Sequence, residues 1–397
     1  MIELEVAGKR YSNFTTGVCS LNLDSLCNSF QFTMVAPDPP RNPVPFKADA
    51  PCRVFVDGIL QLTGFIENME VNYSRENHTV IISGRDKPCD LLDSTLNFGM
   101  PDLSGDGVYL WKIIEDVLAH INLDISVIRA TSVEPFSSKE VLVSPEPGLN
   151  CFKYIEAFAK MRRVLLTSDP AGNIVIARNN KQKAAGRIQH RIGARDNNVL
   201  NASFKYDGTK LYGLYLVDRG SNPLLGGLTE ERLVSTADSL DRAAKPRNYS
   251  DDLSDFFLDG DFRQSRQLIF KEVTSGDTAQ SGIRCLWENN VRQSRSTTLS
   301  VSVPGFRVGY DSGDLWNTNR LYDVVDDFLL IDSPMLCRSV NFQYSKNKGS
   351  ETTLSLIGPD AYTTDAVIPQ PSGVIAGPVE AEALNFFTGT APEQPFI

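Results

Sequence analysis

The sequence predicts a mainly β protein with α+β insertions, and three observations support this fold class. The first 90 residues alternate apolar and polar positions, with turn-forming residues between the runs, a pattern typical of antiparallel strands. Two segments between residues 91 and 180 instead repeat their apolar positions at helical spacing. Strand patterns return from residue 199. We therefore expect two all-β units, each a barrel or a sandwich, separated by a small α+β unit.

The first β unit, residues 1–90, contains two predicted hairpins. Arg53–Val56 and Ile59–Leu62 flank Asp57-Gly58, a dipeptide that suits the positive φ angles of a two-residue turn. A longer hairpin is expected to follow, with Phe65–Tyr73 returning as Thr79–Ser83. The unit is thus a meander of five or six strands.

The α+β unit, residues 91–180, begins with a predicted helix from Leu110 to Ile121, for which Asp106 is a candidate cap. A second helix is expected to begin at Asn150. A hairpin follows, with Val164–Thr167 and Ile174–Ala177 as its two strands. Helices of this spacing bury one apolar face, and together with the hairpin they predict a small α+β domain.

A basic connection, residues 181–198, leads to the second β unit. Six Lys and Arg and no acid between Arg178 and Arg195, with little apolar content, predict an exposed connection. The second β unit covers residues 199–360, with strands such as Val199–Tyr206 and Leu211–Asp218 and an insertion at about 219–295 that ends in a helix. Residues 361–397 are rich in Pro, Gly and Ala and predict an extended C-terminal tail.

Composition excludes several classes of protein. The 49 Asp and Glu against 39 Lys and Arg give a net charge of −10, which argues against general binding to nucleic acid. No apolar run approaches the length of a membrane helix, and residues 1–10 show no pattern of an export signal. Seven cysteines without a CxxC pair predict reduced, mostly buried thiols made in a cytoplasm.

Catalytic and metal sites have only weak candidates. Cys151 could pair with His120 or His190, because its position at a helix start could lower its pKa, but no flanking motif of a thiol enzyme is present. A pair of carboxylates from the acidic insertion is the other hydrolytic candidate. The carboxylates between Asp251 and Asp261 lack the spacing of an EF-hand loop. We expect no catalytic residue, no cofactor and no metal.

Several short motifs occur in one order over roughly residues 50–360. They are Asp57-Gly58, Leu62-Thr63-Gly64, Ser83-Gly84-Arg85-Asp86-Lys87, Asp90-Leu91-Leu92-Asp93-Ser94, Leu286-Trp287-Glu288, Val303-Pro304-Gly305-Phe306, Leu315-Trp316-Asn317-Thr318-Asn319, Ser333-Pro334-Met335-Leu336, Val340-Asn341-Phe342 and Gly349-Ser350-Glu351-Thr352-Thr353-Leu354-Ser355-Leu356. In this order the chain resembles the baseplate hub proteins of Mu-like contractile-tailed bacteriophages, which are related to the upper part of type VI secretion spike proteins.

The resemblance implies two tail-tube-like β-barrels per chain and a homotrimeric ring. Such a ring would adapt the six-fold tail tube to the three-fold central spike and allow DNA to pass. It implies the tail tube protein above and the central spike protein below as partners, with baseplate wedge proteins and the tape measure protein as further candidates. Neither specific nucleic-acid recognition nor membrane insertion is implied. The expected location is the virion tail baseplate, after assembly in the host cytoplasm.

Two groups of residues are candidate interfaces. Arg187, Arg191 and Arg195 could meet the acidic insertion of an adjacent chain, since residues 230–261 hold nine carboxylates against four Lys and Arg. The apolar Phe386, Phe387 and Phe396 could order on a partner, or the tail could pack on its own domain. Two other functions stay open: a tail-tip peptidoglycan hydrolase and a carbohydrate-binding tail module.

Overall fold

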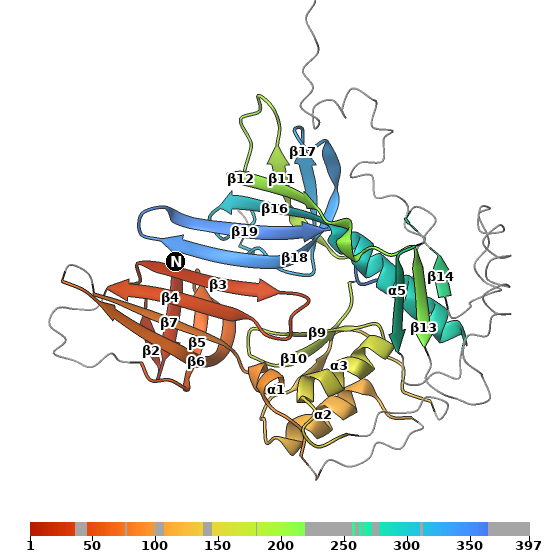
Figure 1. Ribbon diagram of the computed structural model, residues 1–397. Coiled ribbons are helices and arrows are strands. Elements are labelled where there is room, and N and C mark those ends of the chain that lie inside the picture. Colours follow the sequence, from red (N-terminus) through yellow and green to blue (C-terminus); the bar gives the residue numbers. More distant parts are fainter. Residues whose placement is uncertain are drawn as a thin grey trace, which may run out of the picture.

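The computed structural model is mainly β, with two β units side by side and helices gathered at one side (Figure 1). It describes residues 1–35, 46–75, 78–97, 99, 107–137, 145–179, 181–218, 256–258, 262–263, 265–271, 278–309 and 313–363. The predicted fold class, a mainly β protein with α+β insertions, is confirmed at this level.

The first β unit is a meander whose hairpins lie where the sequence predicts them. Its strands are β1 (Ile2–Val6), β2 (Lys9–Tyr11), β3 (Thr16–Asn22), β4 (Ser29–Val35), β5 (Ala50–Val56), β6 (Ile59–Tyr73) and β7 (His78–Asp86). Asp57 and Gly58 have φ angles of 48° and 78°, as the predicted β5–β6 turn requires. The long hairpin of β6 and β7 is also confirmed.

The α+β unit follows its prediction closely. It contains α1 (Cys89–Asp93), α2 (Leu110–His120), β8 (Val127–Arg129), α3 (Cys151–Met161), β9 (Leu165–Ser168) and β10 (Ile174–Ala177). Asn150 caps α3, since its side chain accepts a hydrogen bond from the Lys153 backbone N–H. Tyr109, not the predicted Asp106, occupies the cap position of α2, and it makes no side-chain cap bond. Asp106 itself lies outside the described residues.

The second β unit begins earlier than its sequence pattern indicates. Its strands are β11 (Lys183–His190), β12 (Asn201–Tyr206), β16 (Thr297–Pro304), β17 (Leu321–Asp326), β18 (Ile331–Ser345) and β19 (Gly349–Ile357), with a short 3-10 helix η1 (Gly208–Lys210) after β12. The sequence predicted an exposed connection over residues 178–195, and this is wrong for residues 183–190, which form β11. β11 pairs in parallel with β17, and the buried Ile188 anchors it in the core.

A small third sheet lies beside the second unit. It has the order β14 (Phe256–Leu258), β13 (Leu214–Asp218), β15 (Gln267–Lys271), and α5 (Thr278–Ser296) contacts it. The predicted strand at 211–218 thus exists but does not belong to the main sheet. Most of the predicted insertion, and the tail beyond residue 363, lie outside the described residues.

One sheet of 13 strands joins the two β units, because β3 of the first pairs with β18 of the second. A single apolar core extends through both units, from Ile2 to Leu356. Among the described strands, no pair closes either unit into a barrel. No helix in the described part of the chain is long and apolar enough to span a membrane.

Candidate assembly surfaces and the joint between the units

The joint between the β units is built on backbone pairing. β3 and β18 run antiparallel from Asn22 opposite Ser339 to Thr16 opposite Ser345. Figure 1 shows β3 and β18 lying next to each other in the middle of the molecule. Strand pairing fixes both the distance and the register of two elements. The two units are therefore held in one defined relative position.

A cluster of ionic and hydrogen-bonding side chains around the buried Asp24, just after β3 in the sequence, reinforces this joint. The Asp24 carboxylate, in the turn that follows β3, pairs with Arg338 of β18 at 2.9 Å and with Arg295 of α5 at 2.8 Å. The Tyr362 hydroxyl donates to the same oxygen at 3.0 Å, and Arg295 donates to Tyr362 at 2.9 Å. Asp24 is only 6% exposed. One carboxylate thus ties the first unit to three distant parts of the chain.

A second contact joins the units at the β5–β6 turn. The Asp57 carboxylate forms an ion pair with Arg307 at 3.3 Å and a second one with the amino group of Met1. Arg307 also donates to the backbone carbonyl of Gly313. The turn is therefore fixed to the loop that follows β16.

The first unit contacts the α+β unit through the carboxyl group of Asp86. The Asn28 backbone N–H donates to it at 2.9 Å, and the Ser168 hydroxyl donates to the same oxygen. The Asn28 amide donates to Ser168 at 2.8 Å. Because Asp86 is completely buried, desolvation raises the pKa of its carboxyl to about 6, although these hydrogen bonds oppose the rise.

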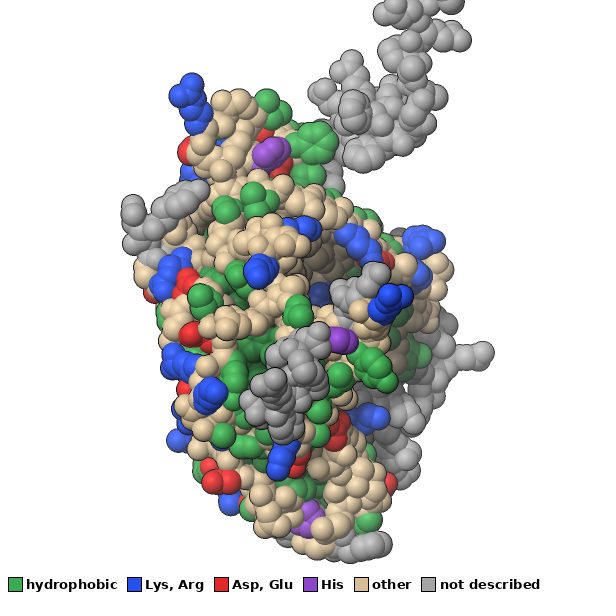
Figure 2. Space-filling view, turned by 90° about the vertical axis from the view of Figure 1, so that its left-hand side faces the viewer, with side chains coloured by type: hydrophobic (Ala, Val, Ile, Leu, Met, Phe, Trp, Pro, Cys, Tyr) green, Lys and Arg blue, Asp and Glu red, His purple; other side chains and the backbone are tan. Residues whose placement is uncertain are grey.

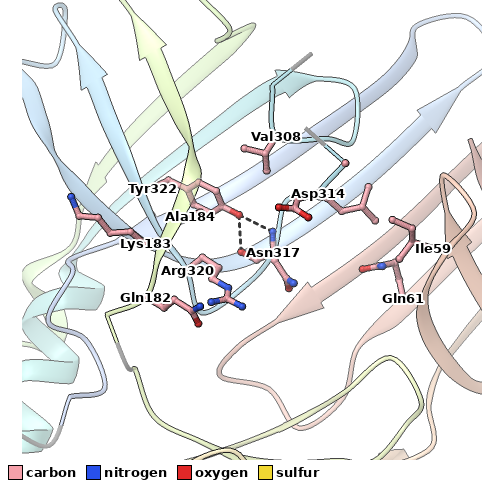
Figure 3. A pocket seen from close by; sticks show the side chains of 12 residues that line it. Ile59, Gln61, Gln182, Lys183, Ala184, Val308, Asp314, Asn317, Arg320 and Tyr322 are labelled. Carbon is pink, nitrogen blue, oxygen red and sulfur yellow. Dashed lines mark hydrogen bonds between the residues drawn. The ribbon is translucent and has the colours of Figure 1, made fainter. Parts of the chain in front are cut away.

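A pocket of about 510 Å³ lies where the two units meet, between the β5–β6 hairpin and the loop before β17. Figure 3 shows Gln182, Arg320, Asn317 and Asp314 around it, with Tyr322 at its wall. The Tyr322 hydroxyl donates to the Asn317 carbonyl at 3.3 Å and accepts from its N–H at 2.9 Å. Burial raises the pKa of Tyr322. This hydroxyl therefore serves to hold the loop.

The three candidate interface arginines lie at one end of β11. Arg187 is an exposed strand residue opposite Asp323 of β17. Arg191 and Arg195 are exposed in the turn that follows. Asn197 braces that turn, because its side chain accepts from the Arg191 N–H at 2.7 Å and donates to the Arg191 carbonyl at 2.9 Å. The structure thus brings the three arginines to one edge.

The other predicted interface residues fall outside the described part of the chain. These are Phe386, Phe387 and Phe396 of the tail and the nine carboxylates between Glu230 and Asp261. Their contacts stay predictions.

The thiol candidate for catalysis does not have the expected environment. All seven cysteines are buried and none forms a disulfide, as predicted. Burial raises the pKa of Cys151, so the expectation that the helix start lowers it is wrong. His190 lies 3.4 Å from Asp326 of β17, in another unit. Among the described residues, no group of three or more His, Cys, Asp and Glu could hold a metal ion.

The sequence did not reveal the residues of the joint. Asp24 and Arg338 are 314 positions apart, and Asp57 and Arg307 are 250 apart. No local pattern marks such pairs. The one signal was indirect, since Asp57 and Asp86 both lie in motifs that carried the family resemblance.

The architecture, a mainly β chain with two joined β units and an α+β unit, is shared with tail proteins of phages. The 43 kDa tail protein of prophage MuSo2 from Shewanella oneidensis has a TM-score of 0.71 and 24% identity, over 90% of this chain and 98% of that one. A tail protein from Neisseria meningitidis MC58 has a TM-score of 0.71 and 17% identity, over 91% and 98%. These likenesses show the fold.

A more distant likeness extends to secretion machinery. The Escherichia coli c3393 protein, described as a component of the type VI secretion system with structural similarity to T4 tail proteins gp27 and gp5, has a TM-score of 0.52 and 11% identity. It is matched over 89% of this chain and 76% of that one. No curated protein sequence matches the chain.

Family models identify the domains at both ends of the fold. Residues 1–86 match the model "Mu phage baseplate assembly protein GpP-like, N-terminal", and residues 277–365 match "Mu phage baseplate assembly protein GpP, fourth domain". The resemblance seen in the sequence is confirmed: the chain carries these two domains of a Mu-type phage baseplate protein. In sequence and in fold the chain is therefore similar to structural tail and baseplate proteins of phages.

Proposed function

We propose that the chain is the baseplate hub, a homotrimeric ring that adapts the six-fold tail tube to the three-fold central spike. The observation that carries the proposal is the pair of β units, matched at residues 1–86 and 277–365 by two domains of the GpP family and joined through β3 and β18. Three chains supply six such units, which equals the subunit number of a six-fold ring. Each unit is proposed to complete a tube-like barrel in the assembled ring.

The rigid joint supports a role in transmitting force. Backbone pairing, the Asp24 cluster and the Asp57–Arg307 pair resist sliding of one unit past the other. A ring of units fixed in this way can take the tube protein above and the spike protein below without changing shape. Wedge proteins and the tape measure protein remain proposed partners of the outer and upper faces.

The net charge suits a channel for DNA. Three chains of charge −10 would give the ring a strong negative charge. Carboxylates facing the lumen would keep the phosphate backbone from adhering as it passes. We include passage of DNA in the proposal on this ground.

Electron microscopy of the purified full-length chain tests the proposed ring. Averages viewed along the ring axis should show three-fold symmetry, six similar lobes and a central channel. Averages that show an elongated particle without a channel would contradict the hub proposal and favour a carbohydrate-binding tail module.

A further inference from the structure

The two β units repeat one strand order. In the first unit the order is β3-β4-β7-β6-β5, and in the second it is β12-β16-β19-β18-β17. All of these neighbours are antiparallel. The correspondence ends at the next strand, since β1 is antiparallel to β5 whereas β11 is parallel to β17.

The repeat extends to single residues. β6 and β18 each have 15 residues, and their partners β7 and β19 each have nine. Each long strand shifts register once against its partner, between Ile66 and Asn68 in β6 and between Cys337 and Ser339 in β18. Superposing these bulges places Asn68 on Ser339 and Tyr73 on Tyr344. The superposition can be followed one strand further, because β3 pairs with β4 as β12 pairs with β16. It then places Phe204 of β12 on Cys19 of β3.

The second unit pairs one edge of β18 with β3, and the corresponding edge of β6 in the first unit has no such partner among the described strands. The far half of β18, residues 339–345, has β19 on one edge and β3 on the other. The far half of β6, residues 68–73, pairs with β7 alone among the described strands. Similarly β3 lies between β4 and β18, whereas β12, the counterpart of β3, ends the sheet after β16. One strand of each unit is thus left with an open edge.

Both open edges expose apolar side chains at positions that are buried in the joint. Val340 and Phe342 of β18 are completely buried. Their counterparts Met69 and Val71 are 40% and 48% exposed, and Tyr73 is 82% exposed. Figure 2, which shows the left-hand side of the view in Figure 1, has hydrophobic side chains open to solvent among scattered Lys and Arg side chains. Tyr206 of β12 is 60% exposed.

We propose that β12 of one chain pairs antiparallel with the far half of β6 of a second copy of this chain, in the register that β3 and β18 use within the chain. The proposal rests on the ring described above and names its interchain contact. It places Ala202 opposite Tyr73, Phe204 opposite Val71 and Tyr206 opposite Met69. A strand added to an open edge satisfies the backbone groups of both edges.

Charge complementarity supports the register. It places Lys205 opposite Glu70, with both side chains exposed. Within the described part of the chain, Lys205 pairs with Asp207 at 3.4 Å, and Glu70 accepts a hydrogen bond from the Asn72 side chain at 2.9 Å. Opposite charges directly across two strands are favourable, and like charges there are unfavourable. Because the two strands belong to different β units, the contact is head-to-tail and closes only as a ring.

Paired cysteines test the register in the full-length chain. The double variants Glu70→Cys/Lys205→Cys and Asn72→Cys/Ser203→Cys place thiols in register, and they should give covalent trimers on mild oxidation. The matched control Asn68→Cys/Ser203→Cys uses the same strands four residues out of register and should not. The native cysteines are buried, which keeps the background low.

Charge reversal gives a second readout that needs no disulfide. Glu70→Lys and Lys205→Glu should each raise the concentration at which the trimer half dissociates by roughly tenfold, and the double reversal should restore it to within about twofold. A trimer that forms neither in-register crosslink and ignores both reversals would overturn the proposed contact but leave the ring intact. A chain that stays monomeric at every concentration would overturn both.

Discussion

At the scale of single residues, the buried carboxyl of Asp86 makes stability depend on pH. Its pKa is about 6 in the folded protein against an ordinary 3.8, so the folded state binds more protons between these values. The stabilising effect is complete below pH 3.8 and is lost as the pH rises through about 6. Asp86→Asn should remove this dependence.

Urea unfolding of both proteins at several pH values measures the effect. Between about pH 4 and pH 7 the parent should lose about 2–3 kcal/mol of unfolding free energy that Asp86→Asn does not lose. The difference in unfolding free energy, variant minus parent, should therefore rise by this amount. Parallel curves for the two proteins would show that Asp86 does not titrate in this range.

The Asp24 cluster belongs to the same scale. Asp24→Ala leaves Arg295, Arg338 and the Tyr362 hydroxyl without their shared acceptor. Because the two arginines are 39% and 33% exposed, water offsets part of the loss, and we expect a cost of about 2 kcal/mol in unfolding free energy. Lys112→Ala, which breaks an exposed pair within α2, is the control and should lower the unfolding free energy far less, because water screens that pair. Equal effects of the two substitutions would refute a structural role for the cluster.

At the scale of elements, the β6–β7 hairpin depends on a close approach of two backbones. A Cβ atom on Gly64 would overlap the Arg85 carbonyl oxygen, while one on Gly313 meets no heavy atom within 4 Å. Gly64→Ala should therefore lower the melting temperature strongly, with a cost of about 3 kcal/mol, and Gly313→Ala should not. Differential scanning calorimetry measures the melting temperatures of both variants. A melting temperature of Gly64→Ala equal to that of the parent would mean that the two strands can move apart at no cost in stability.

Local patterns predicted most elements and failed where long-range contacts decide. The β5–β6 turn followed from Asp57-Gly58, and α3 followed from its cap and apolar stripe, because both signals lie within a few residues. β11 was missed because its basic sequence has little apolar alternation, and only pairing with β17 makes it a strand. The joint at Asp24 could not be predicted, since its partners are hundreds of positions away.

At the scale of the whole molecule, two similar strand orders in one chain explain how a trimer could form a six-membered ring. Within the chain, β3 and β18 make one contact between units, and the open edges of β12 and β6 offer a second of the same kind. Three chains would then alternate three internal and three external joints. The family resemblance led us to expect a trimeric ring, but the strand edges that we propose as its contacts could be identified only in the structure.

The native mass of the purified full-length chain, measured by light scattering over a range of concentrations, decides whether the chain forms a closed ring of three. Three chains of 43.9 kDa give about 132 kDa, and we expect this mass for the largest closed species because a head-to-tail ring leaves no free edge. A stable dimer or tetramer would contradict it, as would a monomer that persists at high concentration.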